Sequence, residues 1–363
     1  MTEGNVFRGE HWELSYGIET GYGIDPKEAN LTRPFGVFEK ASLGDPEMDY
    51  TPFYGSGGGT ARRYFRAYRN KMALEASISD VLLLNGAPLF LPFGSIVNTN
   101  LGGAPIVWRH DIKEITLLPS FTMHASFWKA DNDATPNFQR RYLGCKVGKA
   151  TISAEEEERL RVSFDSVLFK DIKHNAPDGV APTSVPKYAS LVKPVLDYPT
   201  TEPFFFSGGV LTINNNVFAR VKSFKLDVNN NCEAKYYIAG HDPANPIPYT
   251  VLEGKREYTL TCNVDAEDTK LYQEVLQAGL SGTSVVGIGV SFKISRGNVT
   301  QAPNDYIQID MPGAGYGPTA EQQGCFLKKA PMPIDSGSPA VAQELEFVVR
   351  RVDITAEDGD SWA

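Results

Sequence analysis

The chain has 363 residues, 42% hydrophobic and 22% charged, which is typical of a soluble folded protein. This length exceeds what one ordinary core needs and predicts two domains. The formal net charge of −9 disfavours tight binding to nucleic-acid phosphates, and no stretch reaches the ~20 apolar residues of a membrane helix.

The start of the chain, MTEGNVFRGEHWELSYG, has neither the basic nor the apolar region of a secretory signal, so we do not expect export. The four cysteines are far apart and none belongs to a CxxC pair, which disfavours zinc and redox motifs. In a cytoplasm their thiols are expected to stay reduced. They are Cys145, Cys232, Cys262 and Cys325.

Two glycine-rich stretches invite comparison with phosphate-binding motifs. GSGGGTAR at 55–62 lacks the Lys-Ser or Lys-Thr and the following helix of a phosphate loop. GAGYG at 313–317 lies between β-like runs and lacks the helix that follows a dinucleotide fingerprint. We interpret both stretches as loops and predict no cofactor.

The five histidines show no metal-ligand spacing, because HxH, HxxxH and HExxH do not occur. His110 precedes Asp111, and such a pair can orient a nucleophile, but no GxSxG elbow or equivalent accompanies it. The sequence therefore predicts neither a metal site nor an enzyme.

Four consecutive glutamates stand in AEEEERLRVSF at 154–164. Two interpretations are open: a solvated turn at a strand start, or an acidic surface that repels a polyanion over ~10 Å. The residues are Glu155, Glu156, Glu157 and Glu158.

Six prolines between 176 and 203 preclude a continuous helix or a central strand there. We interpret 181–202 as a Pro-rich linker between a first β domain at 1–180, which includes an N-terminal arm, and a second β domain at 203–363.

Alternating strands and one helix are predicted for the second part. SGGVLTINNN and VFARVKSFKLDVNNN end in Asn-rich turns. GKREYTLTCNV alternates apolar and polar residues, and DAEDTKLYQEVLQAG at 265–279 follows as a helix with an acidic cap and a terminal glycine. VVGIGVSFKIS is again a strand. This order indicates a helix against a β-sandwich or barrel.

The two parts resemble each other. MALEASI at 72–78 matches YTLTCNV at 258–264 with an offset of 186, and LRVSFDSV at 160–167 matches LEFVVRRV at 345–352 with an offset of 185. SFTMHASF at 120–127 matches VSFKIS only if the second part carries an insertion of about 15 residues. The near-equal offsets predict a duplicated fold.

Four stretches, in this order, resemble the major tail tube proteins of long-tailed bacteriophages. SYGIETGYG at 15–23 resembles that family's opening, and 140–171 resembles its Tyr-x-Gly-Cys strand and hairpin. The strand pair at 207–240 and GKREYTLTCNVDAED at 254–268, with the helix after it, resemble its most recognisable part.

The resemblance implies two tail-tube-like β-sandwich or barrel domains, each with a short flanking helix. Subunits of that family close into rings that stack into the tube through which DNA is ejected. Because six domains usually surround the bore, three copies of a two-domain chain would form a pseudo-hexameric ring; a ring of six copies is the alternative. The resemblance also implies a siphovirus virion tail assembled in the host cytoplasm, tape measure and tail terminator partners, DNA that passes without specific binding, and no membrane.

Within that reading, the polar faces of the alternating strands and the four glutamates are candidates for the bore lining. Neighbouring subunits can join their sheets edge to edge. The Pro/Gly-rich stretches 25–60, 176–203 and 296–340 are candidates for mobile loops that reach the next ring. The candidate lining residues are Lys225, Asp227, Glu257, Thr259, Thr261, Asn263, Glu155, Glu156, Glu157 and Glu158.

A ligand- or carbohydrate-binding β-sandwich is the alternative function. In that case Trp108, Tyr236 and Tyr237 would stack on sugar rings. The lack of a secretory signal argues against this alternative.

Overall fold

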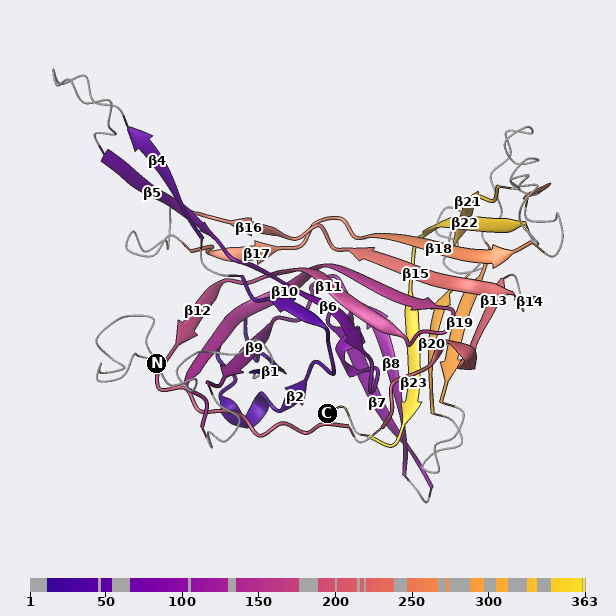
Figure 1. Cartoon of the computed structure of the whole chain (residues 1–363), viewed down its shortest axis with the longest axis horizontal. Coiled ribbons are helices and arrows are strands. Elements are labelled where there is room, and N and C mark those ends of the chain that lie inside the picture. The colour runs from indigo at the N-terminus through magenta and orange to yellow at the C-terminus, as the bar shows by residue number, and fades with distance from the viewer. Residues whose placement is uncertain are drawn as a thin grey trace.

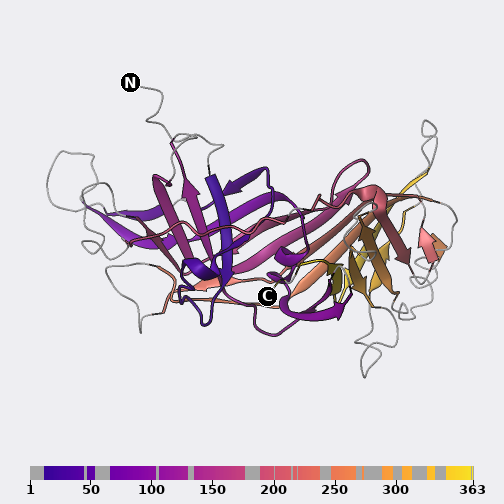
Figure 2. The same cartoon turned by 90° about the horizontal axis from the view of Figure 1, so that it is seen from below.

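The protein is mainly β, as its alternating sequence predicts, and elongated (Figures 1 and 2). No helix in the described part of the chain is long and apolar enough to span a membrane. The computed structural model describes residues 12–44, 47–53, 66–103, 106–129, 135–175, 189–199, 201–213, 216–218, 220–237, 247–266, 272–273, 288–296, 305–312, 325–331, 341–360 and 362. We call 12–175 the first half and 201–362 the second half.

One long antiparallel sheet runs through both halves. Its strands follow the order β3-β6-β11-β10-β15-β18-β22-β21. Inward residues such as Leu226, Leu260 and Phe347 are buried, whereas their neighbours along each strand point to the opposite face. The strands are β3 (Lys40–Ser42), β6 (Glu75–Leu82), β11 (Arg161–Leu168), β10 (Phe138–Glu155), β15 (Val221–Asn229), β18 (Glu257–Asp265), β22 (Ala342–Val349) and β21 (Phe326–Lys329).

A smaller sheet covers the inner face of the first half. Its order is β2 (Arg33–Pro34), β1 (Trp12–Ile18), β9 (Phe121–Phe127), β10 and β12 (Asp171–His174). Strand β10 belongs to both sheets, since its beginning pairs with β9 and its end pairs with β15. Gly144 lies at a register shift near the end of the part that pairs with β9, with a φ of 66°, a conformation that glycine adopts without strain. The long strand can therefore bend from one sheet into the other.

A seven-stranded sheet covers the inner face of the second half. Its order is β14 (Asn216–Phe218), β13 (Gly209–Ile213), β19 (Val290–Ser295), β20 (Tyr306–Met311), β23 (Asp353–Asp358), β8 (Val107–Glu114) and β7 (Gly94–Gly102). Strands β14 to β23 have the same chain order and pairing as β2, β1, β9, β10 and β12. The β7–β8 hairpin comes from the first half and extends the second-half sheet through β23.

Apolar side chains between the sheets form one core that includes residues of both halves. Phe35 contacts Tyr16 and Phe164 with ring centroids 4.7 and 5.6 Å apart, which joins the two sheets of the first half. In the second half, Phe224 of the long sheet stacks on Phe292 of β19 at 4.4 Å. Burial of such aromatic side chains is a main source of stability.

Each half also carries a two-stranded ribbon between corresponding strands of the long sheet. The β4 (Glu47–Phe53) and β5 (Arg66–Ala73) ribbon lies between β3 and β6 in the chain, and extends away from the body in Figure 1. The β16 (Glu233–Lys235) and β17 (Thr250–Leu252) ribbon lies between β15 and β18. It returns over the first half, where Val251 N donates to Tyr22 Oη at 2.8 Å.

The helical elements of the described residues are short. Three 3-10 turns occur, namely η2 (Glu28–Asn30), η3 (Ala87–Phe90) and η4 (Phe206–Gly208). The helix predicted over 265–279 lies outside the described residues except at its start and at Tyr272 and Gln273, which are helical. The glycine-rich stretches at 55–62 and 313–317 also lie outside them.

Two of the three predicted mobile stretches contain core structure, so that part of the prediction is wrong. Leu31 and Phe35, inside 25–60, are completely buried. Strand β20, inside 296–340, buries Ile307 and Ile309 in the seven-stranded sheet. Within 176–203, the described residues 189–199 form no regular element, and Asp197 N donates to Thr32 O of the first half.

The sequence offset between the halves does not describe equivalent positions. Ile78 pairs with Phe164 in the β6–β11 ladder. Adding the offsets 186 and 185 to Ile78 and Phe164 gives Val264 and Val349, which would pair with each other if the offsets marked equivalent positions. Val349 pairs instead with Tyr258, six residues from Val264. The order of the strands repeats in the two halves, but the residues matched by these offsets do not occupy equivalent positions along their strands.

Candidate functional site: the polar face of the long sheet

The outward face of the long sheet, which we call the polar face, carries most of the candidate residues. On β15, Lys225 lies opposite Thr261 of β18, and Asp227 lies opposite Thr259. Asn263 and Glu257 extend the same row of outward positions along β18, since they alternate with buried residues. The structure thus brings six predicted residues together on one surface.

The glutamates do not act as one group. Glu155 ends β10 opposite Ser223 and belongs to the polar face. Glu156 and Glu157 form the exposed turn to β11, where Glu157 has a φ of 65°. Glu158 approaches Arg161 at 3.4 Å. Glu156–Glu158 thus form a turn at the end of the sheet, which is compatible with both interpretations of this run.

The centre of the polar face is a network of mixed charge. Thr151 Oγ1 lies 2.8 Å from Asp165 Oδ2 and 2.9 Å from Asp227 Oδ1, and Lys225 Nζ lies 3.1 Å from Asp227. A hydroxyl has one proton to donate, so Thr151 satisfies only one of the two carboxylates at a time. Burial, and then the charge of Asp227, raises the pKa of Asp165 above its ordinary value.

Strands at the ends of the sheet continue this pattern of paired charges. Arg161 lies between Asp80 and Glu158, at 3.8 and 3.4 Å. On the other side, Lys328 pairs with Glu346. A cation that is already paired with a carboxylate attracts a phosphate less strongly than a free one. The cations at these positions of the polar face are therefore already paired with carboxylates.

Sequence reasoning missed the contributions of β11 and β22 to this face and, apart from Glu155, that of β10. Thr151 and Ser153 on β10, Asp165 on β11 and Glu346 on β22 are outward polar residues next to the predicted ones. Each stands in an alternating run, so the period-2 pattern contained the signal. The pairing of those strands with β15 and β18 was not visible in the sequence.

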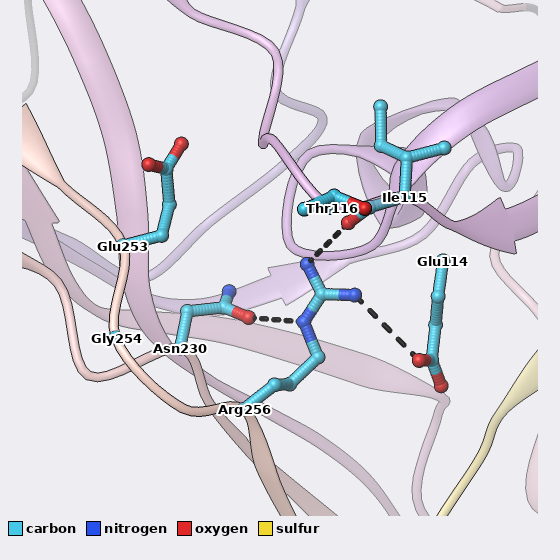
Figure 3. A pocket seen from close by; sticks show the side chains of 7 residues that line it. All are labelled: Glu114, Ile115, Thr116, Asn230, Glu253, Gly254 and Arg256. Atoms are coloured by element: carbon cyan, nitrogen blue, oxygen red, sulfur yellow. Dashed lines mark hydrogen bonds and ion pairs between the residues drawn. The ribbon is translucent and has the colours of Figure 1, made fainter.

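A pocket of about 550 Å³ lies where the second half meets the first (Figure 3). Arg256 donates to Asn230 Oδ1 at 2.7 Å and to Ile115 O at 3.3 Å, and lies 3.8 Å from Glu114. The guanidinium is thus engaged by residues from both halves, which indicates a contact that fixes their arrangement. The lining residues are Glu114, Ile115, Thr116, Asn230, Glu253, Gly254 and Arg256.

The residues considered for reactive chemistry have structural surroundings. His110 is buried, and it contacts Asn98 and Asp358 at 2.8 and 3.2 Å and stacks on Trp362 at 3.7 Å. Asp111 pairs instead with Arg109. His110 and Asp111 therefore do not form the orienting pair that their adjacency suggested.

The cysteine thiols, and the aromatic residues considered for sugar binding, also have structural surroundings. Burial raises the pKa of the Cys232 thiol to about 11, so it stays protonated at neutral pH.

Trp108 lies on β8, whereas Tyr237 follows β16 and contacts Tyr249 at 5.8 Å. Within the described residues, no group of three or more His, Cys, Asp or Glu side chains could hold a metal ion.

The described residues form a β-rich protein whose long sheet ends in two outer edge strands. The sequence model of the phage tail tube protein family matches residues 14–349, nearly the whole chain. The chain belongs to this family. It is a structural component of the virion tail that self-assembles into a tube, and the family's role is not enzymatic. A search of the curated proteins found no match.

Proposed function

We propose that three copies of the chain close into a pseudo-hexameric ring, and that stacked rings form the conduit for DNA ejection. The carrying observation is the repeated strand order, because β2-β1-β9-β10-β12 and β14-β13-β19-β20-β23 are two versions of one unit. We further propose that the halves correspond to two tube domains, 1–180 and 203–363, joined by the linker 181–202. Six units then surround the bore in a ring of three chains.

In this ring the polar face lines the bore. Its carboxylates repel the DNA backbone, and the cations paired with them hold little attraction for phosphates. Residues Lys225, Asp227, Glu257, Thr259, Thr261, Asn263 and Glu155 would face passing DNA. Glu156, Glu157 and Glu158 would stand at the rim of the sheet, where they repel DNA at a bore entrance or at the boundary between rings.

The family supports further proposals on partners and setting. A tube of defined length needs a tape measure protein inside it during assembly and a tail terminator protein at its end. We propose both as partners, with assembly in the host cytoplasm of a siphovirus. A carbohydrate-binding role has less support, because Trp108 lies on β8 of the seven-stranded sheet, whereas Tyr237 follows β16 of the β16–β17 ribbon.

Electron microscopy of the purified protein, combined with mass measurement, tests the copy number. A ring of three 39.9 kDa chains that shows six lobes around a channel is the expected result. A ring of six chains would contradict the proposal that each chain supplies two units. A protein that stays monomeric at high concentration and binds glycans would favour the alternative function.

A further inference from the structure

The seam between the two halves is an antiparallel strand pair inside one chain. The end of β10, residues 149–155, pairs with β15 at residues 223–229 without a register shift. Lys149 lies opposite Asn229, and Glu155 lies opposite Ser223. Inward Ile152 and Leu226 are also opposite each other, and both are buried. The seam therefore continues both the apolar and the polar face of the sheet.

The strands on the two sides of this seam repeat in the same order. One run is β3-β6-β11-β10 and the other is β15-β18-β22-β21. In both runs, a ribbon separates the first two strands in the chain, and the last strand directly precedes its partner. The seam thus joins the last strand of one run to the first strand of the other. Such a head-to-tail contact can be repeated between identical copies until a ring closes.

Because the seam joins the two runs, one strand of each run remains at an end of the sheet. Strand β21 is the last strand of its run and pairs with β22, and β3 is the first of its run and pairs with β6. Within the described residues neither strand has a partner strand on its outer side. Exposed strand edges carry unpaired N–H and C=O groups that favour addition of another strand.

We propose that β21 of one copy pairs antiparallel with β3 of the next copy, with the β10–β15 seam as its template. This inference rests on the proposed ring and specifies its interface. The template also places the β4–β5 ribbon of one copy over the second half of its neighbour. The β16–β17 ribbon does the same within the chain, where Glu253 pairs with Lys146 of the first half at 2.7 Å.

Burial and charge together select the register of this pairing. Leu327 points inward and is buried, and Ala41 and Leu43 contact the core from β3 and the residue after it. Inward residues must lie opposite inward residues, so Leu327 faces one of these two. Opposite Ala41, it would bring Lys40 next to Lys328. Glu346 already pairs with Lys328, and a second like charge directly opposite is unfavourable. Leu327 therefore lies opposite Leu43, and Lys328 lies opposite Ser42.

Disulfide formation between copies tests this register, because directly opposite residues have Cβ atoms close enough for a short bond. Two single variants, Ser42→Cys and Lys328→Cys, are made in a Cys232→Ser background, since the other native thiols are buried. The variants are mixed, assembled, oxidised and separated without reductant. We expect covalent dimers that contain one chain of each kind, at several times the yield found with either variant alone.

The matched control replaces Ser42→Cys with Lys40→Cys, which lies on the same face two residues away. The Lys40→Cys mixture should give several-fold less dimer. A higher yield with Lys40→Cys would overturn the register. Rings seen by electron microscopy without any mixed dimer would overturn the proposed β21–β3 pairing between copies, but not the proposed ring. Unsubstituted protein that forms no rings would overturn the proposed function itself.

A double variant, Ser42→Cys with Lys328→Cys in one chain, provides a second measurement. Each copy then carries both halves of the seam, so oxidation should yield covalent trimers in the assembled ring. Covalent products that extend beyond three chains, with no accumulation at three, would contradict closure of the seam after three copies.

Discussion

At the residue scale, the opening motif SYGIETGYG is organised by a buried carboxylate. Glu19 accepts hydrogen bonds from Gly23 N, Gly144 N and Thr122 Oγ1, all at 2.7 Å. One side chain thus fixes the turn after β1, the adjacent strand β9 and the bend of β10. The sequence resemblance identified the motif, but the structural role of Glu19 depends on hydrogen-bond donors such as Gly144, which is distant in the chain. Only the fold brings these donors together.

A second residue-scale cluster predicts how stability depends on pH. Arg141 Nε donates to His124 Nδ1 at 3.3 Å, so that nitrogen must accept and the imidazole is neutral. His124 is buried, and this burial, followed by the charge of Arg141, lowers its pKa to about 4. Although burial acts in the opposite direction, Arg141 holds the pKa of Asp25 below its ordinary value.

We expect acid to destabilise the subunit first through His124. Above pH ~6.5 the imidazole is neutral in both states. Between ~6.5 and about 4, the unfolded chain binds a proton that the folded chain excludes, so the free energy of unfolding falls, by at most ~3 kcal/mol. Below that range, protonation of Asp25 adds to the loss. Denaturant unfolding from pH 7.5 to 4.5 measures this effect.

The variant His124→Gln provides the comparison, because glutamine keeps polar atoms in the site but does not titrate. Its unfolding free energy should change less between pH 6.5 and 4.5 than that of the natural protein. Parallel pH profiles for the two proteins would show that His124 is not the group responsible.

At the scale of elements, close backbone contacts hold the short turns to the strands. Gly17 lies in β1, and a Cβ there would lie 2.0 Å from Asn30 O at the end of η2. The 3-10 turn can therefore approach β1 only because this strand position lacks a side chain. The turn also carries Glu28, which binds Arg141 at 3.0 Å.

We expect Gly17→Ala to destabilise the protein by ~1–3 kcal/mol, because backbone must move to admit the methyl group. Gly359→Ala is the matched control, since no heavy atom lies within 4 Å of its added Cβ. Urea midpoints of the two variants measure the difference. Equal midpoints would show that η2 moves away without cost.

The same scale shows what sequence patterns could and could not predict. Strand β18 follows from its alternation alone, with Tyr258, Leu260 and Cys262 buried. Strand β20 was missed because its six residues lie inside a long Pro/Gly-rich stretch. MALEASI was interpreted as one strand, but Met72 and Ala73 belong to β5 of the β4–β5 ribbon, and Glu75 begins β6. Alternation identifies strands well, whereas their ends and partners depend on long-range pairing.

At the scale of the whole molecule, the proposal that the polar face lines the bore implies that the charge of this face determines whether DNA slides or binds. We expect Thr259→Lys with Thr261→Lys to give assembled tubes a salt-dependent affinity for DNA. Two added phosphate contacts correspond to a change of roughly tenfold between 50 and 200 mM salt. DNA ejection from virions built with this variant should also slow.

A matched control places the same charge on the other sheet. Thr212 and Ser291 lie opposite each other on β13 and β19, where they alternate with buried residues. Thr212→Lys with Ser291→Lys should leave ejection unchanged. If the control slowed ejection and the β18 variant did not, the seven-stranded sheet would line the bore instead.

The β7–β8 hairpin gives the two halves different surfaces, since it extends the sheet of one half only. Around a closed ring of three chains, halves with the hairpin would therefore alternate with halves without it. A protein that docks on the hairpin would find a site at every third of a turn and not at every sixth. Successive rings could then stack in three equivalent orientations, so the tube would retain a rotational phase along its length.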